Sequence, residues 1–138
     1  MTSTIQSVRR FKVWQHSVNL VIECYNLSAT FPADERFGLV SQIRRAATSV
    51  PANIAEGFGR WNKRDFAGFL AIASGSLREL ETHLIIATRL GYVASVAAEP
   101  ALNEIDQISK MLYRMRLRVN ENARRAEQAV SERRKSVA

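Results

Sequence analysis

Residue types that interrupt or cross-link a chain are scarce in this sequence. Its 138 residues include only 3 Pro and 6 Gly, which leaves room for long helices and is not the composition of a disordered chain. The single cysteine, Cys24, excludes a disulfide within the chain and favours a reducing, cytoplasmic location. The two histidines, His16 and His83, lack the spacing of a zinc site, so we expect no metal and no other cofactor.

Long apolar runs and acidic residues are also lacking. No apolar stretch approaches the ~18 residues of a membrane span, and the opening MTSTIQSVRRFK lacks the apolar core of a signal peptide, so we expect a soluble, unexported protein. The sequence has 13 Asp and Glu but 20 Lys and Arg, which gives a net charge of +7 and a pI near 10.3. This balance favours an acidic partner, most directly nucleic acid, held by salt-sensitive contacts.

What the sequence does contain is helical periodicity. A chain of this length forms one domain, and apolar residues recur at steps of three and four in four stretches, near residues 13–30, 33–56, 62–90 and 100 to the mid-120s. Short connections between four long helices predict an all-α, antiparallel, up-down-up-down four-helix bundle. We assign residues 12–126 to the bundle, residues 1–11 to a flexible basic N-terminus and residues 127–138 to a disordered basic tail.

The periodicity also predicts which faces are buried. In the first helix the predicted apolar face is Trp14, Val18, Val21, Ile22, Tyr25 and Ala29; in the second it is Phe37, Val40, Ile43, Ala47, Val50, Ile54 and Phe58. The third helix, with Asn62 as its N-cap and Gly91 after its end, has Phe66, Phe69, Ala73, Leu77, Leu80, Leu84 and Ala87. A second stripe on the third helix predicts a further neighbour, within the bundle or in another subunit: Gly68, Ala71, Ile72, Gly75 and Ile86. The fourth helix has Leu102, Ile105, Ile108, Leu112, Met115 and Val119.

The second helix combines an internal proline with a polar stripe. Pro51 cannot donate to the carbonyl of Ala47, which predicts a kink near Pro51; alternatively, Pro51 begins a new helix. Gly57 and Gly59 are read as the stop of this helix. The polar stripe is either a solvated face or a functional or oligomer surface. It consists of Gln42, Arg45, Ser49, Asn53 and Glu56.

Three strings within residues 11–93 resemble a known family. They are FKVWQ, then GLVSQIRRAATSVPANIAEGFGR, then FAGFLAIASGSLRELETHL. Their combination, above all the internal Pro followed by NIAEG, resembles the four-helix bundle protein family, also called the 23S rRNA intervening sequence protein family. The sequence departs from the family pattern in its Arg-rich end, from Arg114 onward.

The resemblance implies a small antiparallel bundle that forms a ring-like homo-oligomer, with a homopentamer favoured. It also implies an open reading frame of the kind found within bacterial large-subunit rRNA genes, and from that location an association with RNA. The motif positions that we expect to matter structurally are Gln42, Arg45, Pro51, Asn53, Glu56, Gly57, Gly75, Glu79 and Glu81.

Basic and aromatic residues around the second helix form the candidate RNA-binding site. Guanidinium groups beside an aromatic ring suit unpaired RNA, and the residues are Arg44, Arg45, Arg60, Trp61, Lys63 and Arg64. In the alternative interpretation, Arg45 pairs with Glu56 or Glu81 to hold helices in register, and Trp61 anchors a subunit interface.

Enzymatic signatures are weak. Arg78 and His83 resemble the Arg-x4-6-His signature of HEPN-type ribonucleases, but residues five apart on a helix point about 140° apart. Glu79 and His83 suit an ordinary surface contact. The sequence therefore predicts a non-enzymatic, oligomeric RNA-binding protein with no small-molecule substrate; the alternatives are an assembly or adaptor protein with a protein partner and, third, a ribonuclease.

Overall fold

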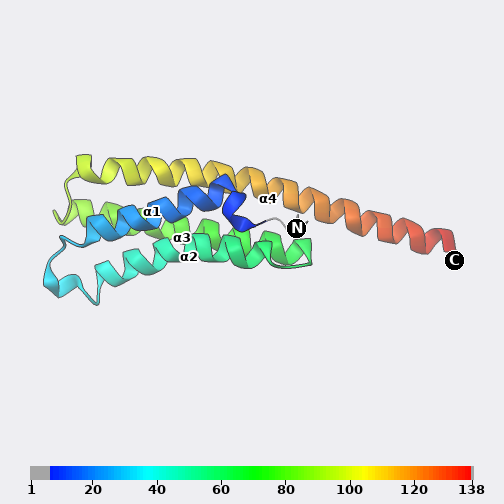
Figure 1. Cartoon of the computed structure of the whole chain (residues 1–138), viewed down its shortest axis with the longest axis horizontal. Helices are drawn as coiled ribbons and strands as arrows, with labels where there is room; N and C mark the ends of the chain where they lie inside the picture. The colour runs from blue at the N-terminus through cyan, green and yellow to red at the C-terminus, as the bar shows by residue number, and fades with distance from the viewer. Residues whose placement is uncertain (1–6, 138) are drawn as a thin grey trace, which may run out of the picture.

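The chain folds into four antiparallel helices in this computed structural model, which describes residues 7–137. The helices are α1 (Lys12–Ser28), α2 (Leu39–Phe58), α3 (Lys63–Arg89) and α4 (Ser95–Val137), with 3-10 turns η1 (Val8–Arg10) and η2 (Ala33–Glu35) before α1 and α2. Successive helices run in opposite directions, and α4 packs back on α1 to close a ring of four (Figure 1). The predicted up-down-up-down four-helix bundle is confirmed.

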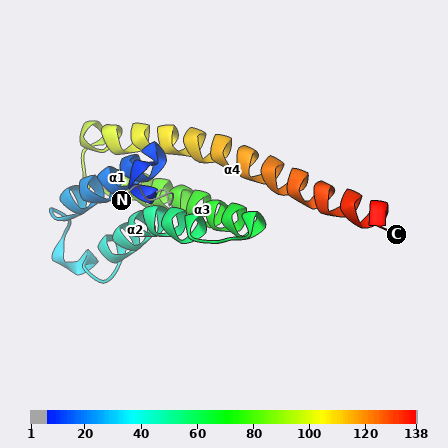
Figure 2. The same ribbon diagram turned by 45° about the vertical axis from the view of Figure 1, so that its right-hand side comes forward.

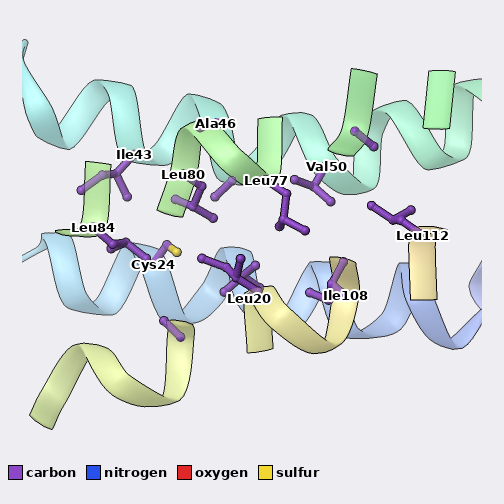
Figure 3. Close-up of a cluster of buried hydrophobic side chains, with 14 of the residues drawn as sticks. Leu20, Cys24, Ile43, Ala46, Val50, Leu77, Leu80, Leu84, Ile108 and Leu112 are labelled. Atoms are coloured by element: carbon purple, nitrogen blue, oxygen red, sulfur yellow. The ribbon is translucent and has the colours of Figure 1, made fainter. Parts of the chain in front are cut away.

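The core is a column of aliphatic side chains between the four helices (Figure 3). Burying one such side chain stabilises the fold by about 1.5–3 kcal/mol. Burial also raises the pKa of the Cys24 thiol to about 12, so this cysteine stays protonated and unreactive at neutral pH. The side chains that line the column include Leu20, Cys24, Ile43, Val50, Leu77, Leu80, Leu84, Ile108 and Leu112.

The N-terminal segment is more ordered than predicted where the structure describes it. The Ser7 hydroxyl accepts a hydrogen bond of 3.2 Å from the Arg9 amide and caps η1. The Phe11 ring packs edge-on against Phe58, with centroids 4.8 Å apart. Residues 7–11 are therefore part of the fold, whereas residues 1–6 of the predicted flexible N-terminus lie outside the described residues.

The buried face of α1 is not the predicted one. Ile22 and Tyr25 are 57% and 41% exposed. Small polar side chains take core positions instead: the Ser17 hydroxyl donates to the Trp14 carbonyl at 2.8 Å, which satisfies it within its own helix. The prediction was wrong because it followed a face about one position away, which left out Leu20 and the small buried side chains. The buried residues are Val13, Ser17, Leu20, Cys24 and Ser28.

The second helix begins later than predicted. A Glu35 carboxylate oxygen accepts from the Leu39 amide at 2.8 Å, and Glu35 therefore precedes α2 as a cap. The other oxygen accepts from the Tyr92 hydroxyl at 3.2 Å, which ties η2 to the turn between α3 and α4. Phe37 lies before the helix and is 88% exposed, so its assignment to the buried face is wrong; Val40, Ile43, Ala47, Val50 and Ile54 are buried as predicted.

The middle and end of α2 depend on Pro51 and Gly57. The helix continues through Pro51, so the alternative of a new helix starting there is wrong, and the kink stays a prediction. Gly57 is not a stop: it lies inside α2 and is buried. A Cβ added there would lie 2.8 Å from the Phe69 Cβ and 2.9 Å from Phe66 Cδ1. Gly57 therefore lets α2 and α3 approach closely, and Gly59 follows the helix end.

The third helix agrees closely with the prediction. The Asn62 side chain accepts from the Arg64 amide at 2.8 Å and from the Asp65 amide at 3.4 Å, as expected of an N-cap. Gly91 has φ of 80°, a conformation that favours glycine. The main apolar stripe faces the core, with Ala73, Leu77, Leu80, Leu84 and Ala87 buried. The second stripe, Gly68, Ala71, Ile72, Gly75 and Ile86, is exposed along its whole length.

The fourth helix is much longer than predicted. It starts at Ser95, includes Pro100 in its second turn, and continues to Val137. Its C-terminal part projects past the ends of the other helices (Figures 1 and 2); we call residues 120–137 the arm. The expected disordered tail is helical here because Ala, Glu, Arg and Gln are strong helix formers, and because Glu121 binds both Arg124 and Arg125. Among residues 7–137, no helix has the length and hydropathy needed to cross a bilayer.

Candidate nucleic-acid interface

The predicted basic patch is divided between two places. Arg44 and Arg45 lie near the start of α2, whereas Arg60 to Arg64 lie at the turn between α2 and α3. The helix from Arg44 to its end at Phe58 rises about 21 Å, and Arg60 lies beyond that end. These residues therefore do not form one continuous site.

Arg44 joins α1 to α2. Its Nε donates to the Ser28 hydroxyl at 3.0 Å and its Nη2 to the Tyr25 carbonyl at 3.4 Å. Its guanidinium also lies over the Tyr25 ring, 4.5 Å from the centroid. A cation that satisfies the last carbonyls of α1 has a structural role.

The arginines at the turn are held by carboxylates. Arg60 donates to Glu56 at 2.6 Å and lies over the Phe69 ring at 4.8 Å. Arg64 makes a bidentate pair with Glu127 of the arm, at 2.8 and 3.1 Å. These hydrogen bonds raise the pKa of Arg64 and lower that of Glu127. Each guanidinium therefore has a carboxylate neighbour that competes with an external phosphate, although both pairs are exposed and so individually weak.

Trp61 remains fully exposed beside Lys63. Both line an open groove between the α2–α3 turn and the arm, which we call the turn groove. The other side chains of this groove are Asn62, Arg64, Ala123, Ala126, Glu127 and Val130. An exposed indole beside a lysine keeps the predicted stacking role chemically reasonable, although a carboxylate shares the groove.

Part of the polar stripe of α2 lies in the contact between α2 and α3. The Asn53 amide donates to the Ser49 carbonyl at 2.8 Å and to its hydroxyl at 2.9 Å, and that hydroxyl shares a 2.8 Å hydrogen bond with Ser76. Gln42 and Arg45 at the other end are exposed. The proposed pairing of Arg45 does not form within the described chain, because Glu56 binds Arg60 and Glu81 binds Arg78.

Arg78 and His83 contact different carboxylates. Arg78 Nη1 lies 3.3 Å from Glu81 Oε1, and His83 Nε2 lies 3.4 Å from Glu79 Oε1. No hydrogen bond joins Arg78 to His83 within residues 7–137, so these side chains do not meet as a catalytic pair. Over the same residues, no group of three His, Cys, Asp or Glu side chains has an arrangement that would hold a metal ion.

A row of cations on α4 was missed by sequence reasoning. Lys110, Arg114 and Arg118 are exposed and follow one another at intervals of four residues. Each step rises about 6 Å and turns the helix by about 40°, so the three charges form a gently winding row. We call this row the α4 ridge. None of the three makes an ion pair with any residue that the structure describes.

The α4 ridge borders two grooves. On the α1 side, Arg10 and Lys12 face it across the half-buried Met111 and Met115; this N-terminal groove also includes Phe11, Val13, Arg114 and Arg118. On the α3 side, the α3–α4 groove is lined by Arg78, Ser109, Lys110, Tyr113 and Arg114. Neither groove is lined by a carboxylate residue, so both present positive charge that is open to solvent.

Charge is segregated along α4. Its acids before Lys110 are Glu99, Glu104 and Asp106, of which Glu104 binds His16 of α1. The stretch 107–120 contains four cations and no acid. Glu121, the next acid, is taken up by Arg124 and Arg125, whose hydrogen bonds lower its pKa. The i, i+4, i+8 spacing within an acid-free stretch was a signal in the sequence that could have predicted the ridge.

Comparisons with known proteins agree with the fold. Residues 9–114 match the family described as 23S rRNA-intervening sequence protein. The chain is also similar to a solved structure from Bacteroides thetaiotaomicron, described as a protein with unknown function from the S23 ribosomal protein family. That similarity has a TM-score of 0.69 and 28% identity, and covers 75% of this chain and 96% of the other. No curated protein matches.

The family match covers α1, α2, α3 and the first half of α4, and it ends at Arg114 within the α4 ridge. The arm lies beyond the matched region. Because the match spans well over half of the chain, this protein belongs to the 23S rRNA-intervening sequence protein family.

Proposed function

We propose that this protein is a non-enzymatic, cytoplasmic RNA-binding protein that contacts phosphates with little sequence selectivity. The observation that carries the proposal is the α4 ridge with Arg10 and Lys12 beside it. Five exposed cations converge there without a carboxylate partner among the described residues. A cation without an ion pair retains its full charge for an external anion.

The layout of these cations suits a nucleic acid strand. The ridge places charges at regular intervals along a helix, as phosphates are placed along a strand, and Arg10 and Lys12 add two further charges in the N-terminal groove. Such contacts carry no base information by themselves, which is why limited sequence selectivity is expected. The family description, which refers to 23S rRNA intervening sequences, supports RNA over other polyanions.

Anisotropy titrations of labelled single-stranded RNA against salt concentration test the proposal. If five cations each neutralise one phosphate, the logarithm of affinity falls with the logarithm of salt at a slope of about −3.5. Arg114→Gln with Arg118→Gln should make the slope shallower by about 1.4. Gln keeps the helix propensity of Arg closely enough for the fold to persist, which circular dichroism verifies.

The matched control is Arg133→Gln with Arg134→Gln, which removes the same charge from the end of the arm. If both double variants lose the same affinity and slope, RNA binding depends on the net charge of the protein and the α4 ridge is not a specific binding site. A wild-type protein that binds no RNA at low salt would reject the proposal. Arg45→Gln and Lys63→Gln, in the same assay, test the residues of the predicted patch.

Oligomerisation is the second part of the proposal, and the exposed α3 stripe supports it. Ile72 and Ile86 are 52% and 42% exposed on the same stripe as Gly68 and Gly75. A Cβ added at either glycine would meet nothing within 4 Å in the described protomer. A second copy of the chain would cover this apolar face. The assembly that we expect is the homopentamer implied by the family resemblance. If the protein binds no RNA, the alternative function is that of an assembly or adaptor protein, which would use this face to bind its partner.

A further inference from the structure

We infer that the α3–α4 groove is a subsite for one unstacked nucleobase of single-stranded RNA, with Tyr113 as the stacking surface. The inference rests on the proposed RNA binding and adds the class of RNA and the residue that selects it. Its observations are the exposure of Tyr113, the cations on both sides of it, and the polar groups of α3 and α4 that line the groove.

Tyr113 lies where a base could reach it. Its side chain is 61% exposed, so its ring can be reached from solvent. Lys110 precedes it by three residues and Arg114 follows it, and all three line the same groove. The groove is open to solvent and measures about 380 Å³, so it could cover one face of a base without enclosing it.

The polar groups of the groove complement a base edge. Arg78 of α3 is held 3.3 Å from Glu81, which orients its guanidinium while leaving other donors free to bind a base oxygen or nitrogen. Ser109 adds a hydroxyl that both donates and accepts. Lys110 and Arg114 would bind the phosphates of a nucleotide and Tyr113 would stack on its base. The polar groups of the groove would bind the edge of that base.

This arrangement discriminates between forms of RNA. In a duplex the bases are stacked on one another, and only the backbone reaches the ridge. An unpaired base can leave the strand and lie on the tyrosine ring, which adds stacking to the phosphate contacts. The α3–α4 groove should therefore favour single strands over duplexes, whereas the ridge alone should not.

Trp61 is the competing aromatic residue, and its surroundings are less suitable. The turn groove contains Glu127, and a second hollow beside Trp61 is lined by Glu56 and Asp65. The nearby Arg60 and Arg64 are both bound to carboxylates. In the α3–α4 groove Arg78 is also bound, to Glu81, but Lys110 and Arg114 have no carboxylate partner among the described residues. Tyr113 has only serine and cations along its groove, so the electrostatics favour a base and its phosphates there.

The test uses the whole 138-residue chain and three probes. They are a 12-residue single-stranded RNA with one central 2-aminopurine, a strand of the same length that is abasic at every position, and a duplex of the first sequence. Variants are Tyr113→Ala, Tyr113→Phe and, as the matched control, Trp61→Ala. We expect Tyr113→Ala to weaken single-strand binding about tenfold and to abolish quenching of 2-aminopurine, while Tyr113→Phe retains both. Affinity for the abasic strand and the duplex should not change.

Each other outcome overturns the inference in a recognisable way. If 2-aminopurine quenching is lost in Trp61→Ala and kept in Tyr113→Ala, the base binds in the turn groove and not in the α3–α4 groove. Equal weakening of all three probes by Tyr113→Ala would make the residue structural. RNA binding of wild-type strength in Tyr113→Ala would reject the subsite and leave the proposed function intact, whereas absence of binding by the wild type rejects the function itself.

Discussion

At the scale of single residues, positions of small volume decide how the helices meet. Gly57 allows Phe66 and Phe69 of α3 to lie directly over α2. Ser17 and Cys24 occupy core positions of α1 where larger apolar residues were expected. Such positions are hard to recognise in a sequence, because a small or weakly polar residue suits a core only when a neighbouring helix fills the remaining space.

Gly57→Ala should therefore destabilise the protein. The new methyl group would be 2.8 Å from the Phe69 Cβ and would force a shift of α3, at a cost of about 1–3 kcal/mol. Urea unfolding followed by circular dichroism measures the change. Gly59→Ala is the control, since its added Cβ would lie 3.6 Å from the Glu56 carbonyl oxygen, an ordinary contact, and should change stability by no more than about 0.5 kcal/mol. Wild-type stability in Gly57→Ala would show that the two helices can separate without strain.

At the scale of helices, α3 and α4 contrast in how far the sequence predicts them. The bounds of α3 follow from Asn62 and Gly91, whose side chain and backbone conformation act locally. The end of α4 does not follow from the pattern of buried residues, because the arm has few of them. Helix propensity, pairing within the helix and the Arg64–Glu127 contact extend it to Val137 instead.

The arm should lose helix at acid pH. Hydrogen bonds from Arg64 and Arg124 hold the pKa values of Glu127 and Glu121 below their ordinary 4.5. A folded-state pKa that is lowered stabilises the helix above about pH 4.5, and this contribution disappears as pH falls through the folded-state values. We expect wild type to exceed Glu121→Gln with Glu127→Gln in helical circular dichroism at pH 7, and the two to converge at pH 2. A constant difference across this range would contradict the assignment.

At the scale of the whole molecule, the bundle was predictable and the candidate site was not. Four periodic stretches with short connections are sufficient to predict the bundle. The basic surface, in contrast, brings Arg10 and Lys12 of the N-terminal segment to Arg114 and Arg118, about a hundred residues later. Only the packing of α1 on α4 brings these cations together, whereas the predicted cluster around Trp61 is partly neutralised by Glu56 and Glu127.

Assembly is also a property of the whole molecule. We expect the wild-type mass in light scattering to be a multiple of 15.5 kDa, with five copies favoured. Ile72→Arg should reduce the mass to that of the protomer without unfolding it, because Ile72 is 52% exposed and a charge there opposes burial in an interface. Val96→Arg, at a 75% exposed position in α4, is the matched control. A wild-type mass of 15.5 kDa at all concentrations would exclude assembly through α3.

The segregated charges of α4 also affect how the protein meets a partner before any contact forms. The first part of the helix, residues 95–109, contains three acids and no Lys or Arg, whereas nine of the 20 Lys and Arg residues follow Ser109. The molecule is therefore an electric dipole as well as a net cation, and the field of a polyanion would rotate it during diffusion so that the basic end arrives first. Such preorientation raises association rates and fades as salt shortens the Debye length to about 8 Å at physiological ionic strength.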